Sequence, residues 1–137
     1  MAKLDGTWIY QSFRPFTGPP SPLMPWSSPA RLSVTTDGSG KVDGRLVIPL
    51  PPGAPVPELV LAIGGRITPA SGGPVPVPEG VELTGTVGTS VNELRGYFVA
   101  GGAGPVVVGT IVAVRDDPAG EPNGTSGPFV LVRAAPA

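Results

Sequence analysis

The sequence predicts an all-β protein that folds as a single antiparallel up-and-down β-barrel of about eight strands. Runs in which apolar and polar residues alternate recur along the chain, each bounded by Gly, Pro, Asp or Asn, which is the pattern of β-strands. No segment shows a 3.6-residue apolar repeat with helix caps. The 137 residues include 21 Gly and 20 Pro, yet 40% are hydrophobic and only 14% are charged. Because that is not a disordered composition, the Gly and Pro are interpreted as turns between strands.

Eight runs account for the predicted strands. They cover residues 6–14, 30–36, 41–48, 58–68, 81–87, 92–100, 105–115 and 127–133. The second and third runs are joined by residues 37–40, DGSG, and this short connection of turn-forming residues predicts a tight hairpin. The whole chain, residues 1–137, is expected to form one domain.

Several of the predicted strands carry glycine in the middle. These glycines are Gly44, Gly64, Gly65, Gly85, Gly96 and Gly109. An isolated glycine weakens a strand and often marks a bend or a bulge. A closed barrel needs such bends, and closure also removes the strand edges at which chains aggregate. The alternative architecture is a two-sheet sandwich, in which the glycines simply accommodate close packing.

The run 105–115 is apolar on both of its faces. Val106 and Val108 alternate with Val107 and Ile111, so neither face is suited to water. Such a strand is expected to be covered on both sides, by the barrel interior on one and by a partner subunit on the other. The sequence therefore gives the hypothesis of a homo-oligomer formed through residues 105–115.

Cysteine and histidine are absent from the chain. Disulfides, thiolate chemistry, zinc sites built from Cys and His, and mechanisms with a histidine base are thereby excluded, and we expect no metal or other cofactor. The formal net charge of −1 provides no basic field for nucleic acid. Neither a signal peptide nor an apolar run of transmembrane length is visible, so we expect a soluble, cytoplasmic protein without membrane contact.

The segment 15–29 reads PFTGPPSPLMPWSSP and is both Pro-rich and apolar. Proline restricts the backbone, so this loop should be stiffer than its length suggests. If the strands run up and down, the loop stands at one mouth of the barrel, where ligand sites are often built. Three interpretations remain open. The loop is a lid whose Met24 and Trp26 touch a ligand, a seal against the barrel or a partner subunit, or a disordered connection.

The first run opens with Gly6-Thr7-Trp8, which resembles the G-x-W motif of the calycin superfamily of lipocalins, fatty-acid-binding proteins and avidin-like proteins. The resemblance implies an up-and-down barrel with a long first loop. It also implies that Trp8 points inward, closes one barrel end and packs on a basic residue of the last strand, here Arg133. The chain is also similar to uncharacterised small bacterial barrel proteins that open L-x-G-T-W-x-Y-x-S-F. That likeness is carried by Leu4, Gly6, Thr7, Trp8, Tyr10, Ser12 and Phe13.

The face of the first run that contains Trp8 carries candidate ligand contacts. Tyr10, Ser12 and Arg14 share this face by alternation. If Trp8 points inward, the face is apolar at one end and presents hydrogen-bond donors toward the loop 15–29. A small-molecule site has this composition, mostly apolar with a few placed polar groups. In the alternative, this face lies outside and the opposite face of the strand forms the core.

The sixth run carries the second candidate face. Glu93, Arg95 and Tyr97 share one face of it, and Leu94 and Phe98 share the other. In one interpretation, Glu93 and Arg95 form an exterior ion pair of little energetic weight. If this face points inward instead, Arg95 and Tyr97 could orient an anionic or carbonyl oxygen of a ligand.

Three functions fit these features. The first is a barrel that binds a small, mainly apolar molecule in its mouth under the loop 15–29. The second is a cofactor-independent enzyme of the cyclase or isomerase type, which orients an apolar substrate and relies on Tyr10, Trp26, Arg95 and Tyr97. The third is a structural or interaction module whose barrel is filled by its own side chains. Substrate turnover would separate the second function from the first.

Overall fold

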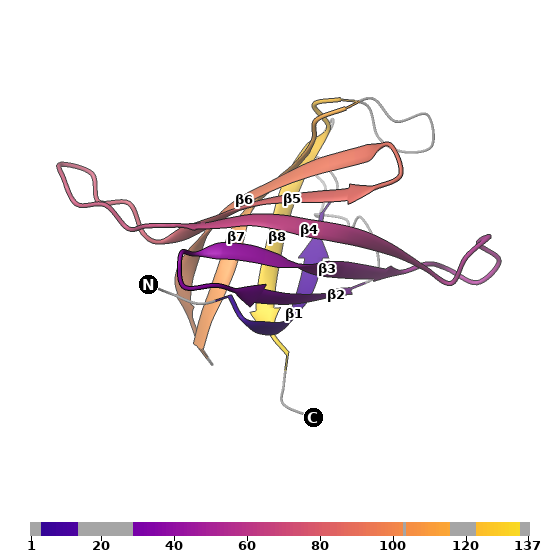
Figure 1. Cartoon of the computed structure of the whole chain (residues 1–137), viewed down its shortest axis with the longest axis horizontal. Coiled ribbons are helices and arrows are strands. Elements are labelled where there is room, and N and C mark those ends of the chain that lie inside the picture. Colours follow the sequence, from indigo (N-terminus) through magenta and orange to yellow (C-terminus); the bar gives the residue numbers. More distant parts are fainter. Residues whose placement is uncertain (1–3, 14–28, 103, 116–122, 135–137) are drawn as a thin grey trace, which may run out of the picture.

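The computed structural model of the chain is a closed barrel of antiparallel strands (Figure 1). It describes residues 4–13, 29–102, 104–115 and 123–134. The strands are β1 Gly6–Ser12, β2 Ala30–Thr36, β3 Lys41–Pro49, β4 Glu58–Thr68, β5 Gly80–Val87, β6 Ser90–Gly101, β7 Gly104–Ala113 and β8 Ser126–Arg133. Within the described ranges, no helix is long and apolar enough to cross a membrane.

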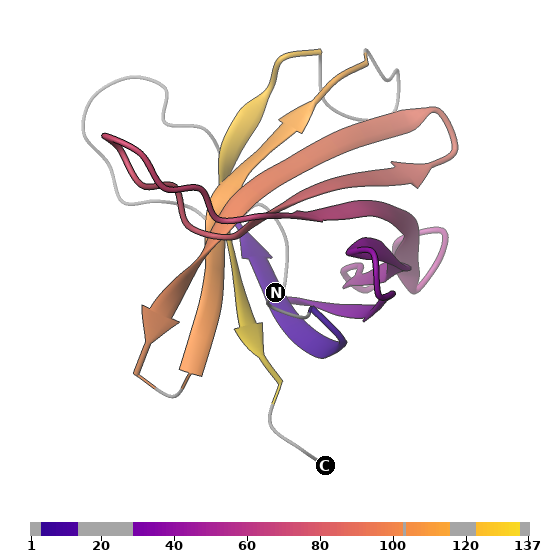
Figure 2. The ribbon, with the colours of Figure 1, turned by 60° about the vertical axis from the view of Figure 1, so that its left-hand side comes forward.

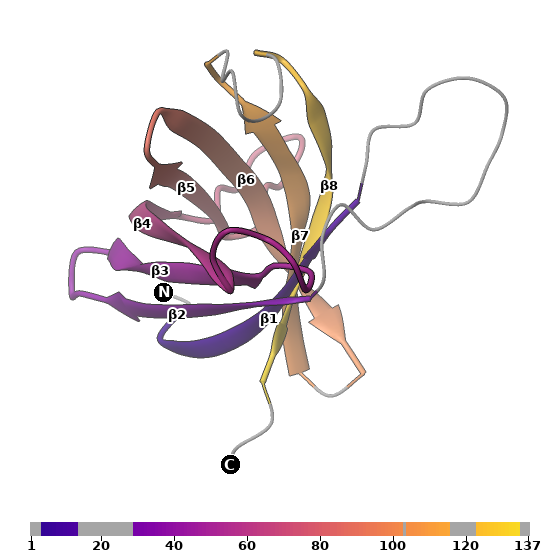
Figure 3. The ribbon, with the colours of Figure 1, turned by 90° about the vertical axis from the view of Figure 1, so that its right-hand side faces the viewer.

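Each strand pairs with the next one along the chain, and β1 pairs with β8 to close the barrel. This closing seam sets Trp8 opposite Arg133 and Ser12 opposite Phe129. Figure 2 and Figure 3 show the sheet curling round until its first and last strands lie side by side. The order is the up-and-down order predicted from the sequence, so the barrel prediction is confirmed over the two-sheet sandwich.

The interior of the barrel is filled by apolar side chains through its middle. Alternation turns every second residue of a strand inward, and each strand contributes at least one large or branched residue that is 4% exposed or less. One such residue from each strand in turn is Trp8, Leu32, Leu46, Leu61, Leu83, Leu94, Val107 and Phe129. A barrel of this size has an interior just wide enough for its own side chains or one small ligand. Any ligand space therefore lies toward an end.

Glycines inside the strands allow neighbouring backbones to approach closely where the sheet curves. A Cβ atom added to Gly65 would lie 2.0 Å from the backbone oxygen of Glu82 on β5. The same atom on Gly44 would lie 2.1 Å from a backbone oxygen of β2, and on Gly109 2.0 Å from one of β6. Gly64, in contrast, has nothing within 4 Å of that position. The bends that the sequence indicated thus depend on particular glycines and not on all of them.

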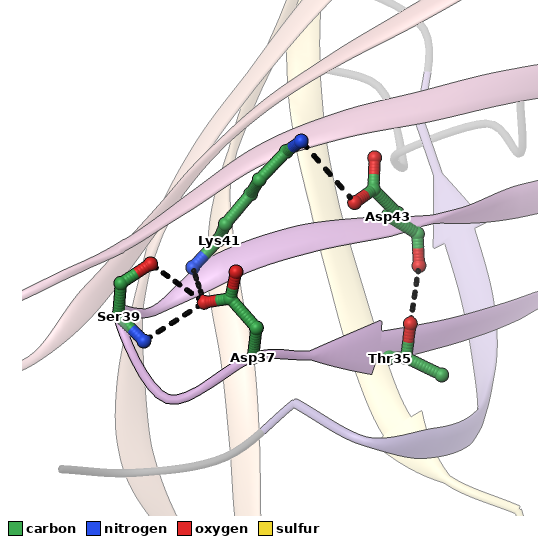
Figure 4. Close-up of polar contacts among 5 residues, drawn as sticks. All are labelled: Thr35, Asp37, Ser39, Lys41 and Asp43. Carbon is green, nitrogen blue, oxygen red and sulfur yellow. Dashed lines mark hydrogen bonds and ion pairs between the residues drawn. The ribbon is translucent and has the colours of Figure 1, made fainter.

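The β2–β3 hairpin contains the tight turn expected at residues 37–40. The Asp37 carboxylate accepts hydrogen bonds from the Ser39 N–H (2.8 Å), the Ser39 hydroxyl (2.7 Å) and the Lys41 N–H (3.0 Å), as Figure 4 shows. These hydrogen bonds, above all the one from the Ser39 hydroxyl, hold the pKa of Asp37 below its usual range. Gly40 adopts a φ of 88°, a conformation that favours glycine. This turn therefore fixes the register of the hairpin locally.

Candidate functional site

One end of the barrel is closed around Trp8. The indole is fully buried, and its Nε1–H donates a 2.8 Å hydrogen bond to the backbone oxygen of Leu4. The Arg133 guanidinium lies over the indole, 4.5 Å from the ring centroid, and donates to the backbone oxygen of Asp5. Gly6 has a φ of 111°, and a Cβ there would lie 2.8 Å from the guanidinium. The inward Trp8 and its contact with Arg133 have the geometry that the G-x-W resemblance implied.

The chain before β1 covers the same end. Leu4 is fully buried, and its N–H donates a 3.2 Å hydrogen bond to the Thr36 hydroxyl at the end of β2. The Thr36 N–H in turn donates a 2.8 Å hydrogen bond to the Asp5 carboxylate. Because this end is occupied by the protein's own chain, the opposite end is the better place for a ligand.

The opposite end, where β1 finishes and β2 begins, has a mainly apolar lining that is open to solvent. Five of its interior-facing residues are only partly buried or exposed, and we refer to them as the mouth: Ile48, Leu59, Val87, Asn92 and Ile111. The interior-facing Ser12, Ala30 and Ala113 at the same end are buried. On β4, Leu59 is 36% exposed, whereas Leu61, the next interior residue, is 4% exposed. Ile48, Val87 and Ile111 pack against the buried core. The mouth is therefore a partly exposed apolar surface that rests on a filled interior.

Two polar side chains of β1 lie inside the barrel near this mouth. Tyr10 and Ser12 face inward and are buried, and the Tyr10 ring stacks on Phe129 with 5.9 Å between the centroids. Burial raises the pKa of Tyr10 to about 12, and a hydrogen bond with the Ser12 side chain acts in the opposite direction with smaller effect. Tyr10 is thus a neutral hydrogen-bonding group over the whole physiological pH range.

The raised pKa of Tyr10 gives a prediction for stability at alkaline pH. Between pH 10 and pH 12 the unfolded chain has lost the phenolic proton while the folded protein keeps it, so deprotonation favours unfolding. We expect this residue to remove about 3 kcal/mol from the unfolding free energy as the pH rises through that window, and nothing below it. Urea unfolding across this range, compared between the wild type and Tyr10→Phe, measures the effect. Parallel pH profiles for the two proteins would contradict it.

The structure places two of the five ligand contacts that were expected on the first strand and the loop after it. Tyr10 and Ser12 lie inside the barrel near the mouth, on the face that Trp8 shares. Arg14, Met24 and Trp26 lie outside the described residues. The inward direction of this face agrees with the expectation that Trp8 points inward.

Arg95 and Tyr97 lie on the outer wall of the barrel and do not face its interior. The alternation of β6 turns Leu94 and Phe98 inward, which sends Arg95 and Tyr97 outward. Tyr97 is 47% exposed, and the Arg95 guanidinium is 3.5 Å from Glu93. The hypothesis that Arg95 and Tyr97 point inward is therefore wrong, and the alternative of an exterior ion pair holds. Leu94 and Phe98, which are more apolar, occupy the interior instead.

Sequence reasoning did not single out the mouth residues. Asn92 lies on the inward face of β6, and its side-chain amide donates a 3.3 Å hydrogen bond to the Ser90 hydroxyl. The signal was present, because Asn92 precedes Leu94 by one alternation step. Val87 and Ile111 had no such signal, since apolar residues at strand ends are common whether or not they line a site.

A hollow of about 340 Å³ on the outside, over β4, β5 and β6, is lined by charged residues that already pair with one another. Arg66 lies 3.0 Å from Glu82, and Arg95 lies 3.9 Å from Glu82. Exposed pairs of this kind contribute little stability, and their charges are largely neutralised locally. Among the residues that the structure describes, no group of Asp and Glu is arranged to hold a metal ion. The mouth is therefore a better candidate site than this charged hollow.

The barrel is similar to solved structures of rhizavidin. The crystal structure of a rhizavidin–biotin complex matches with a TM-score of 0.53 at 14% sequence identity, over 93% of this chain and 100% of that one. A crystal structure of rhizavidin gives a TM-score of 0.55 at 14% identity, over 96% of this chain and 85% of that one. The fold is avidin-like. No protein-family model and no curated protein sequence matches the chain. The likeness of this avidin-like barrel to rhizavidin therefore concerns the fold.

Proposed function

We propose that this avidin-like barrel binds a small, mainly apolar molecule in its mouth. The observation that carries the proposal is the change in exposure along the interior faces of the strands. On β3, β4, β5 and β6 the interior residues are buried through the middle of the barrel and become partly exposed at the mouth, as from Leu61 to Leu59 on β4. Exposed apolar surface on a rigid scaffold is typical of a binding site.

The lining of the mouth indicates the chemistry of the ligand. Ile48, Val87 and Ile111 offer apolar contact, which favours an apolar body. Asn92 at the rim, with Tyr10 and Ser12 deeper, offers a few hydrogen-bonding groups that would orient one polar end. Because the core below is filled, the ligand has to be small.

Two further features support the proposal. The segment 15–29 follows β1 and leads to β2, so it belongs to this same end, and we propose Met24 and Trp26 of this segment, with Arg14 before it, as ligand contacts that lie outside the described residues. Rhizavidin, which has a similar fold, has been crystallised as a complex with biotin, so a barrel of this type can hold a small molecule. The ligand of this chain is proposed from its own mouth residues and not taken from rhizavidin.

Binding is favoured over catalysis by the character of the described groups. Two of the side chains considered for an enzyme, Arg95 and Tyr97, face outward. Another, Tyr10, has its pKa raised to about 12, so its phenol does not act as a base near neutral pH, and the fourth, Trp26, lies outside the described residues. Proton transfer would need a group whose pKa lies closer to the working pH, whereas hydrogen bonding to a ligand needs only the neutral phenol.

Native mass spectrometry tests the proposed site. The protein is recorded before and after incubation with an extract of the producing cell, and we expect an added mass that is released on denaturation. Val87→Trp should fill the mouth and reduce the occupied fraction at least about tenfold, since a bulky residue displaces the ligand. Val60→Trp, at an exposed position on the outer face of β4, is the matched control and should bind as the wild type does. No added mass, or equal occupancy in Val87→Trp, would contradict the proposal.

A further inference from the structure

The tetrapeptide Pro-Val-Pro-Glu occurs twice in the chain, at residues 55–58 and 76–79. The first copy ends the connection from β3 to β4, at the mouth end of the barrel, and the second ends the connection from β4 to β5, at the closed end. Figure 1 shows these two connections projecting from opposite sides of the barrel. We refer to the two copies as the PVPE segments. A partner can therefore reach each of them separately.

The sequence restricts both PVPE segments to an extended backbone. The proline ring fixes the φ angle of its own residue. A residue that precedes proline, as each valine does here, is kept out of the helical region. Alternating proline and valine therefore favours the polyproline II conformation or one close to it, which is the conformation that proline-recognising domains bind. A segment that is extended before binding loses little conformational entropy when it binds.

Backbone hydrogen bonds hold both segments against the rest of their connections. At the first segment, the Leu50 N–H donates a 2.9 Å hydrogen bond to the backbone oxygen of Pro57. At the second, Ser71 and Val77 form an isolated antiparallel bridge, in which each N–H donates a 2.9 Å hydrogen bond to the oxygen of the other residue. The backbones are thus anchored, and a partner would meet them in a defined position.

The valines of these connections are exposed although they are apolar. Val56 is 47% exposed and Val77 is 37% exposed. Val75, which also lies between two prolines, is 78% exposed, the largest value for a large hydrophobic residue in the part of the chain that the structure describes. Prolines alone would protect a projecting hairpin from pairing with other chains. Such protection does not need an apolar side chain between the prolines, so the valines indicate a binding surface.

We infer that the PVPE segments are recognised by a protein module with an aromatic-lined groove beside a basic residue. Proline has no N–H, so these segments offer mainly carbonyl oxygens and apolar side chains. Trp and Tyr side chains suit both, because their rings pack on proline and valine and their N–H or O–H groups donate to carbonyl oxygens. Each segment ends in a glutamate, Glu58 or Glu79, which favours Lys or Arg at the end of the groove.

Two PVPE segments on one barrel allow one chain to hold two such modules at the same time. The segments lie beyond opposite ends of β4, which has 11 residues, so they are separated by roughly 30 Å. At that separation two small modules do not collide, and a partner that carries two modules would gain from the linkage. The inference concerns the outside of the barrel and does not depend on what binds in the mouth.

Affinity capture with peptide competition tests the inference. The immobilised full-length protein is incubated with an extract of the producing cell, and the bound proteins are identified by mass spectrometry. We expect a protein that is displaced by the synthetic peptide GPVPVPEG, which copies residues 73–80, and not by a scrambled peptide of the same composition. If no captured protein is displaced in this way, the inference is wrong.

Alanine variants show whether the PVPE segments themselves are recognised. Pro55→Ala with Pro57→Ala removes the first segment, and Pro76→Ala with Pro78→Ala removes the second. All four prolines are exposed, so the barrel should fold as in the wild type. Each double variant should lose one of the two binding sites, and the fourfold variant should capture at least about tenfold less of the displaced protein.

Pro52→Ala with Pro69→Ala is the matched control. Both prolines are exposed in the same two connections but lie outside the PVPE segments, so this variant should capture as much as the wild type. Titration calorimetry of the purified partner then counts the sites. We expect two modules per wild-type chain and one per chain of each double variant that lacks a segment. Equal capture by the fourfold variant and the control, or a single site on the wild type, would overturn the inference.

Discussion

Gly65→Ala is expected to lower the unfolding free energy by about 3 kcal/mol, and the melting temperature by on the order of 10 °C. The new Cβ would lie 2.0 Å from the Glu82 backbone oxygen and 2.8 Å from the Leu83 Cα atom. Both atoms belong to the backbone of β5, which pairs with β4 over seven residue pairs and does not move aside cheaply. Urea or thermal unfolding, followed by circular dichroism, measures the change.

Gly64→Ala is the matched control for this substitution. Gly64 precedes Gly65 on the same strand and lies on the outer face of the barrel. A Cβ atom added there would meet nothing within 4 Å. Replacing a glycine inside a strand where there is room reduces the freedom of the unfolded chain, so this variant should be neutral or slightly stabilised. If both variants lose the same stability, the close approach of β4 and β5 is not what Gly65 provides.

Trp8→Phe is expected to destabilise the closed end of the barrel by about 3 kcal/mol. The substitution leaves a cavity beneath the guanidinium of Arg133. It also removes the indole N–H, which donates to the backbone oxygen of the buried Leu4. Chemical denaturation measures the loss. A cost below about 1 kcal/mol would contradict the role of the indole in holding the chain before β1.

A double-mutant cycle separates the cation–π contact from these effects. Arg133→Met removes the charge above the ring and keeps an apolar stem, and it should cost less than Trp8→Phe because Arg133 is exposed. The coupling between the two substitutions should be about 0.5–2 kcal/mol, the range of such contacts. Simple additivity of the two losses would contradict a stabilising contact between Arg133 and the indole.

The strands were predictable because turn residues and alternation are local properties of the sequence. The predicted run 58–68 has the same bounds as β4. The predicted run 105–115 begins one residue after β7 begins and ends two residues after β7 ends. The register was not predictable, since it depends on contacts between distant segments. The same is true of the individual roles of Gly64 and Gly65, which are identical in the sequence and differ only in what the neighbouring strand places beside them.

The candidate site was only partly predictable. Alternation shows which residues share a face, but not which face points inward when both carry large apolar groups. On β1 the G-x-W resemblance resolved the choice, and Tyr10 and Ser12 are inside. On β6 no such motif was available. The inward face there is the one with Leu94 and Phe98, so Tyr97 lies outside. The mouth residues emerge only once the strand ends are assembled in space.

The seam between β1 and β8 sets an order of events during synthesis on the ribosome. Every other strand pair joins neighbours in the sequence and can form soon after both strands emerge. The seam instead joins the beginning of the described chain to its end, as in the contact of Asp5 with Arg133, 128 residues apart. Until β8 has emerged, the nascent sheet keeps two free edges, and Trp8 lacks the guanidinium above it. Translation that stops before Ser126, where β8 begins, would therefore release an open sheet prone to pair with other chains.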